Sequence, residues 1–357
     1  MERLRWTWIW LPPFAGALSL IFGDRMSIPP ILLGIVLIVT VLAAVHHAEL
    51  IAHKVGEPFG TFLLALAVTV IEVGLILTLM LQGKAGAETL ARDTVFSAVM
   101  IILNGLIGAF ILVGALRHHE QSFQQVGVSA SLATLTVLTV LTLVLPNFAA
   151  TEHGPYYAPS QLAFVAIVSL LLYLTFVMVQ TVRHRGYFLP PDGAAEDPDA
   201  HAPPPSGRQT ALSGALLVAC LIEVVLLAKA LAPSIEDGVA AAGAPHAVVG
   251  VVIAALVLLP ESVAAVRAAM ANRLQTSLNL ALGSALATIG LTIPAVAMLS
   301  LSQGLPLALG LDSKGVVLLS LTLLVTTQSL ATARTTVLQG VVHLVIFGVF
   351  IFITLVP

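Results

Sequence analysis

Long apolar runs recur along the whole chain, and short polar segments separate them. An apolar stretch of about 20 residues is long enough to cross the hydrocarbon core of a bilayer as an α-helix. Because these runs are continuous rather than alternating, they exclude a membrane β-barrel. The pattern predicts an all-α polytopic membrane protein of about eleven spanning helices, over 8–23, 30–52, 59–82, 94–116, 126–147, 160–183, 210–232, 245–270, 275–301, 315–332 and 335–356.

One long polar segment divides the chain into two halves. Residues 184–209 are rich in Pro, Ala and Gly and carry several acids, so we expect a flexible acidic linker. An extra helix within 1–29 stands apart; five helices then lie in 30–183 and five in 210–357. Because five is odd, the halves enter the membrane with opposite orientations, which predicts two inverted five-helix repeats.

Composition supports a membrane protein and says little about other partners. The chain of 357 residues is 58% hydrophobic and 9% charged, whereas soluble domains carry about 25% charged residues. No basic patch indicates nucleic acid, and the single cysteine, Cys220, provides no disulfide framework. The expected partners are therefore the lipid bilayer and whatever the protein transports. The oligomeric state stays open.

The distribution of Lys and Arg predicts the orientation. If the N-terminus is cytoplasmic, ten of the 15 Lys and Arg residues fall on the cytoplasmic side and five outside. Loops on the cytoplasmic side carry the excess of positive charge. We therefore expect the N-terminus and the linker in the cytoplasm and the C-terminus outside.

Two carboxylates interrupt the apolar runs at comparable places in the two halves. Glu72 lies in LAVTVIEVGLILTLML (66–81) and Glu261 in VVIAALVLLPESVAAV (251–266). A charge at the bilayer centre costs about 2.5–3.5 kcal/mol on insertion scales, so such acids are usually functional. Burial disfavours the charged form, whereas a cation between two carboxylates favours it. Protons and cations are expected to compete for Glu72 and Glu261, which is the basis of a proton-coupled antiporter.

Neutral oxygens accompany these acids. Pro260 frees the backbone carbonyl of Leu256, and the side chains of Thr69, Asn104, Ser284 and Thr288 lie at similar predicted depth. An all-oxygen ligand set favours Na⁺, K⁺, Ca²⁺ or Mn²⁺ over Zn²⁺ or Cu²⁺. Glu72 and Glu261 are the predicted metal ligands, and no cofactor is expected besides the transported cation and protons. Glu49 and Glu223, in the first helix of each half, are predicted secondary proton or gating residues.

Two other classes of function remain open at this stage. His46, His47, Glu49 and His53, with His118 and His119, superficially resemble the histidine boxes of membrane metalloenzymes, although a complete box needs more ligands. A channel is the third possibility, but paired buried acids in an inverted repeat favour alternating access. His343, alone in the last helix, is expected to be structural.

The stretch HHAELIAHKVGEPFGTFLLALAVTVIEVGLIL (46–77) resembles the first signature of the cation/proton exchanger (CAX) branch of the calcium/cation antiporter superfamily, bacterial calcium/sodium–proton antiporters in particular. LVLLPESVAAVRAAMANRLQTSLNLALGSALATIGLTIP (256–294) is similar to the second signature. The resemblance implies a cytoplasmic-membrane antiporter that exchanges Ca²⁺, or alternatively Na⁺ or K⁺, for H⁺ by alternating access.

The resemblance also implies roles for individual residues. Glu72 and Glu261 take the positions of the family's two cation-binding glutamates, Asn104 that of the first-repeat Asn, and Ser284 that of the second-repeat Ser. The chain departs from the family where Thr69 stands in place of an Asn, and where Ser262 replaces the His that follows the second glutamate in many members. Fewer amide ligands leave room for Na⁺ or K⁺ beside Ca²⁺.

Overall fold

The computed structural model describes residues 29–56, 59–83, 86–190 and 205–356, together with positions 14 and 16. Most of the predicted first helix, 8–23, lies outside these residues. The elements are α2 (Pro30–Val55), α3 (Phe59–Leu81), α4 (Ala87–Met100), η1 (Ile101–Leu106), α5 (Ile107–His118), β1 (Gln121–Ser122), α6 (Gln125–Thr139), η2 (Val140–Val144), η3 (Leu145–Phe148), α7 (Pro159–Met178), η4 (Val179–Arg183), η5 (Arg185–Phe188), α8 (Gly207–Ala241), α9 (Ala247–Met270), α10 (Leu274–Gln303), α11 (Ser313–Ser329), β2 (Arg334–Thr335) and α12 (Val337–Leu355).

The all-helical prediction is confirmed over the described residues, where a helix lies at each predicted span from 30–52 onward. Among the described helices, seven are long and apolar enough to cross a membrane, and the bent helix α9 is an eighth. One predicted boundary is wrong: α8 does not end at 232 but continues through Pro233 to Ala241. Proline is tolerated inside membrane helices, because neighbouring groups satisfy the freed backbone.

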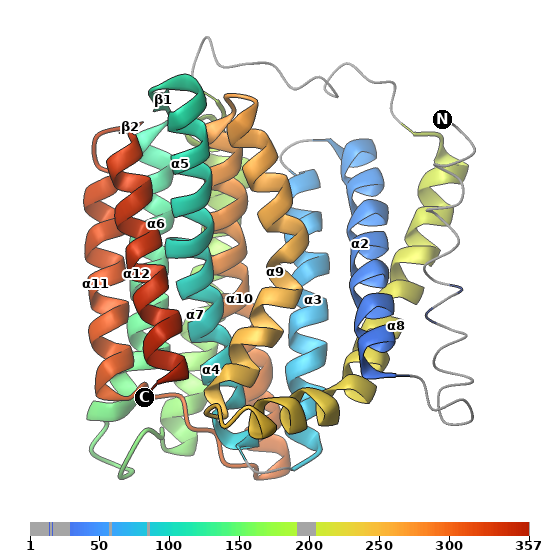
Figure 1. Cartoon of the computed structure of the whole chain (residues 1–357), viewed down its shortest axis with the longest axis vertical. Helices are drawn as coiled ribbons and strands as arrows, with labels where there is room; N and C mark the ends of the chain where they lie inside the picture. The colour runs from blue at the N-terminus through green and yellow to red at the C-terminus, as the bar shows by residue number, and fades with distance from the viewer. Residues whose placement is uncertain are drawn as a thin grey trace.

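The helices pack as two groups, seen side by side in Figure 1. α2 and α8 contact each other extensively and, with parts of α3 and α9, bury one hydrophobic cluster. The remaining helices surround α10 and bury a larger cluster. α10 is covered along most of its length, so the hydroxyl groups of Ser284, Thr288 and Thr292 are buried.

The third helix of each half packs against helices of the other half. α10 packs against α3 and α7 of the first half, and the continuous α4–η1–α5 helix packs against α9 and α12 of the second. In both cases the third helix of one half contacts the second and fifth helices of the other. An inverted repeat produces this reciprocal packing; the domain boundaries at 183 and 210 stay a prediction.

The beginning of the predicted linker is packed against the bundle. Phe188 is buried, and the Asn279 side chain donates a hydrogen bond to its carbonyl at 2.6 Å. At the same end of the molecule β1 pairs antiparallel with β2, Gln121 opposite Thr335. The chain therefore does not leave the bundle at 184; the acids at 192–199 lie outside the described residues.

Candidate functional site

One face of α10 joins the two predicted acids. Ser284 and Thr288 are four residues apart, so their side chains lie one helical turn apart on the same face. The Thr288 hydroxyl donates a hydrogen bond of 2.7 Å to Oε2 of Glu72 on α3. Ser284 lies beside the carboxyl group of Glu261 on α9, and Glu72 is near enough to interact with that group electrostatically. The structure thus brings four sequence-predicted residues together.

Both carboxyl groups are buried and poorly satisfied. Glu72 and Glu261 are each 2% exposed. Oε1 of Glu72 and both oxygens of Glu261 make no hydrogen bond of good geometry to the described residues. No Lys or Arg of the described residues forms an ion pair with either acid. Buried oxygens of this kind are stable only when protonated or bound to a cation.

Helix α9 changes direction where the sequence places Pro260. Its two parts, Ala247–Leu259 and Glu261–Met270, are inclined by 53°. A proline removes one backbone hydrogen bond, which is an ordinary cause of a sharp helix bend. The bend turns the chain immediately before Glu261. Leu256 is partly buried beside the α2–α8 cluster, and the role of its carbonyl as a ligand stays a prediction.

Asn104 lies in a π-helical turn and makes contacts that the sequence did not indicate. η1 interrupts the α4–α5 helix at 101–106. The Asn104 side-chain amide donates to the Thr322 hydroxyl on α11 at 2.9 Å and lies 3.8 Å from the sulfur of Met100. Its Oδ1 atom has no hydrogen-bond partner among the described residues. The amide nitrogen is thus engaged with α11, while the oxygen is left for another donor or a cation.

The remaining predicted residues occupy different surroundings. Thr69 is buried on α3, one turn before Glu72. Glu49 is exposed on α2, whereas Glu223 is half-buried on α8. Oε2 of Glu223 is buried without a hydrogen bond to the described residues, and it lies against Gly16.

Thr292 was missed by the sequence analysis. It lies one turn beyond Thr288 on α10 and is fully buried, and its hydroxyl has no partner among the described residues. The spacing of four residues through Ser284, Thr288 and Thr292 is the signal that could have found it.

The described histidines are not gathered into a metal centre. The described residues contain no group of three or more His, Cys, Asp or Glu side chains that could hold a metal ion. The rings of His46 and His47 lie 5.8 Å apart on α2, and Nε2 of His118 is hydrogen-bonded to the carbonyl of Met270.

A bundle of apolar helices with paired buried acids and hydroxyl groups is typical of secondary transporters of cations. The sodium/calcium exchanger protein family model matches residues 30–182 and 212–356. The chain belongs to this family, within the calcium/cation antiporter superfamily. It is a membrane-spanning cation antiporter and not an enzyme, so the metalloenzyme alternative is wrong.

Individual relatives and structures agree with this assignment. A putative ionic transporter of Sinorhizobium fredii, y4hA, is 49% identical over 98% of this chain and 96% of its own. The sodium-potassium/proton antiporter ChaA of Escherichia coli is 32% identical over 95% of this chain and 93% of its own. Native YfkE has the same fold, with a TM-score of 0.72 at 17% identity over 98% of this chain and 100% of its own. The H⁺/Ca²⁺ exchanger CAX, at 16% identity, also has a TM-score of 0.72, over 98% of this chain and 88% of its own.

Proposed function

We propose that the protein exchanges a cytoplasmic cation for external protons at a site formed by Glu72 and Glu261. The observation that carries this proposal is the single α10 face on which Thr288 holds Glu72 and Ser284 lies beside Glu261. This face keeps two buried carboxyl groups close together without a compensating positive side chain from the described residues. Such a pair binds protons or a cation in turn.

Protons and cations compete for this site because the empty, doubly ionised site is unfavourable in free energy. Two ionised carboxylates at this depth repel each other and are deprived of water. Two protons or a bound cation remove the repulsion, and the buried oxygens then gain partners. A carrier of this kind changes its access side when it is loaded, because crossing with an empty charged site is unfavourable.

Ca²⁺ is the first candidate for the cation. Its charge balances two carboxylates, and it prefers six to eight oxygen ligands. Asn104 Oδ1, the hydroxyls of Ser284 and Thr288, and the carbonyl of Leu256 are the proposed additional ligands. The Ca²⁺/H⁺ antiporter ChaA of Bacillus subtilis, 23% identical over 80% of this chain, transports this ion by its name.

Na⁺ or K⁺ is the second candidate. The Escherichia coli relative is named a sodium-potassium/proton antiporter and is 32% identical over nearly the whole chain. Hydroxyl groups, rather than amides, contact the two acids here. A site with fewer strong oxygen ligands distinguishes less sharply between Ca²⁺ and monovalent ions.

Alternating access is the proposed mechanism, with movement of the α2–α8 pair. These helices bury a hydrophobic cluster separate from the larger one. A small apolar cavity of about 30 Å³ lies where α2 and α8 meet α3 and α9. The α2–α8 pair can slide along this apolar contact at low cost, because no hydrogen bonds have to break. Glu49 and Glu223 lie on this moving pair, so we assign them a secondary role in gating or proton transfer.

The test uses inside-out membrane vesicles with an acidified interior and a pH-sensitive dye. Addition of Ca²⁺, Na⁺ or K⁺ should cause proton efflux that Glu72→Gln and Glu261→Gln abolish. Glu120→Gln is the matched control, because Glu120 is exposed and pairs with Arg334 away from the site.

The outcome also names the ion. Efflux with Ca²⁺ alone supports the first candidate, and efflux with Na⁺ or K⁺ alone supports the second. Folded protein that shows no cation-dependent efflux, or efflux that both glutamine variants retain, contradicts the proposed site.

A further inference from the structure

A cavity of about 210 Å³ lies at the predicted outer end of α4, α9, α11 and α12. It is separate from the Glu72–Glu261 region described above, because Glu72 lies on α3 and Glu261 about four turns beyond the start of α9. A cavity of this size holds several water molecules if its walls offer polar partners.

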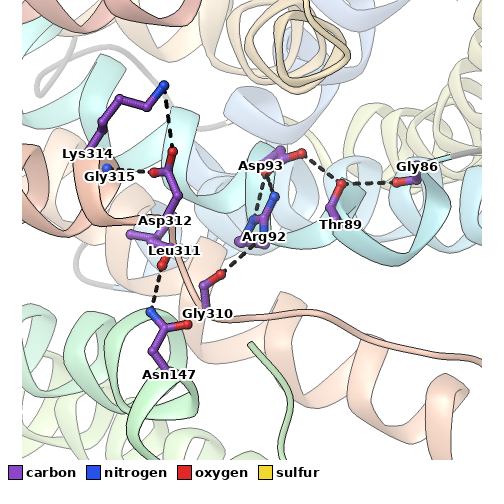
Figure 2. Close-up of polar contacts among 10 residues, drawn as sticks. All are labelled: Gly86, Thr89, Arg92, Asp93, Asn147, Gly310, Leu311, Asp312, Lys314 and Gly315. Atoms are coloured by element: carbon purple, nitrogen blue, oxygen red, sulfur yellow. Dashed lines mark hydrogen bonds and ion pairs between the residues drawn. The ribbon is translucent and has the colours of Figure 1, made fainter. Parts of the chain in front are cut away.

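Four charged side chains line this cavity, namely Arg92, Asp93, Asp312 and Lys314, and Figure 2 shows their polar contacts. Arg92 pairs with Asp93 at 2.8 Å and donates to the carbonyl of Gly310 at 3.1 Å. Asp312 accepts a hydrogen bond from the backbone N–H of Gly315 at 2.7 Å and lies 3.9 Å from Lys314. Four charged groups on one wall favour contact of this cavity with water rather than with lipid.

A polar group also lies inside the cavity. Ser97 lines the wall and is 3% exposed. Because buried hydroxyl groups are normally hydrogen-bonded and this one lies on the cavity wall, we expect it to contact water within the cavity.

An apolar layer closes the inner end. Leu318 and Phe350 line the cavity, and with Met100 and Ile346 they form a small hydrophobic cluster. Phe96 packs edge-on against Phe350, with ring centroids 5.6 Å apart. An apolar constriction of this kind closes a channel because water is excluded from it, and ions and protons then cannot pass.

A polar layer lies directly beyond the apolar one. Thr322 is one turn further along α11 than Leu318, and it binds the Asn104 amide. His343 is two turns from Phe350 on α12 and is fully buried, and neither ring nitrogen makes a hydrogen bond of good geometry to the described residues. Cavity, apolar layer and polar layer therefore follow one another along α4–η1, α11 and α12.

We propose that these three layers form an outer access route for protons, closed by the apolar layer. The inference rests on the proposed antiport and adds a path for one of its two ions. The polar layer contains no carboxylate of its own to balance the charge of a metal ion, although its Asn104 is also a proposed ligand of the Glu72–Glu261 site. A proton needs only a chain of water and hydrogen-bonding groups, and Ser97, Thr322, Asn104 and His343 offer those groups in order. No charged side chain of the described residues faces His343 from η1, α5 or α11.

Cysteine accessibility tests the route without requiring transport. Cys220 is the only cysteine, so Cys220→Ser provides the background. Ser97→Cys should react with a membrane-impermeant cationic thiosulfonate applied from the outer face, whereas Thr322→Cys should react slowly. Leu318→Ala opens the apolar layer and should accelerate modification of Thr322→Cys by about tenfold. This factor corresponds to lowering the barrier to entry of the reagent by about 1.36 kcal/mol. Leu321→Ala is the matched control, because Leu321 is exposed on the outside of α11.

Transport then separates the two proposals. Modification of Ser97→Cys should slow cation-driven proton movement by about tenfold, while labelling itself should persist in the Glu72→Gln protein. No reaction at Ser97→Cys from the outer face overturns the route, and so does labelling that leaves proton movement unchanged. Neither result affects the Glu72–Glu261 proposal, which fails only if its own glutamine variants retain exchange.

Discussion

Replacing Thr288 by Val removes one hydroxyl group from the centre of the site at nearly constant volume. The hydroxyl donates to Oε2 of Glu72 at 2.7 Å. A hydrogen bond to an ionised group contributes about 1.5–3 kcal/mol, against about 0.5–1.5 kcal/mol between neutral groups. The cation-loaded site needs ionised Glu72 and the proton-loaded site needs the neutral form. The variant should therefore disfavour the cation by about 1–1.5 kcal/mol, or about five- to twelvefold in affinity.

The assay is the concentration of cation that gives half-maximal dye recovery in acid-loaded vesicles at fixed pH. Thr288→Ser keeps the hydroxyl and should remain within about twofold of the wild type. Thr142→Val controls for loss of a buried threonine hydroxyl elsewhere, because the Thr142 hydroxyl donates to the carbonyl of Leu138 in its own helical segment. An unchanged half-maximal concentration for Thr288→Val, or an equal rise in both controls, would refute the role of α10 in holding Glu72.

Two further predictions concern stability. Gly290→Ala places a Cβ 2.5 Å from the Cβ of Tyr173. This clash should destabilise the protein by about 1–3 kcal/mol and lower its Tm. Gly214→Ala is the control and should leave the Tm unchanged, because Gly214 has open space around it. Tyr157 donates to the carbonyl of Leu141 at 2.6 Å, and burial raises the pKa of Tyr157 to about 12, so the phenol remains a donor at physiological pH. Tyr157→Phe should lower the Tm without changing cation affinity; an unchanged Tm would contradict this.

The sequence was sufficient to place the helices and the two acids. Apolar runs of spanning length have one common structure in a membrane, because every backbone group must be satisfied internally. An acid in such a run is conspicuous, so Glu72 and Glu261 could be selected from the sequence alone. Ser284 and Thr288 could be selected as well, because they stand four residues apart in the helix after Glu261.

The rotation of each helix about its axis and the partners of its polar side chains could not be predicted from the sequence. The spanning helices are apolar on all sides, so the pattern does not say which face meets which neighbour. The π turn at 101–106 depends on packing against α12, and it sets the direction in which Asn104 points. Its partner Thr322 lies 218 residues further along the chain, and a threonine in an apolar helix gives no distinguishing signal.

The absence of a positive side chain beside the two described acids has an electrical consequence. One Ca²⁺ cancels two carboxylates, two protons also cancel them, and a monovalent ion with one proton does the same. On any of these loadings the occupied site is neutral, so its movement carries no net charge through the membrane field. A full charge would change its energy by about 2.3 kcal/mol per 100 mV. Exchange at such a site follows the chemical gradients of proton and cation, and the membrane voltage contributes little to its direction.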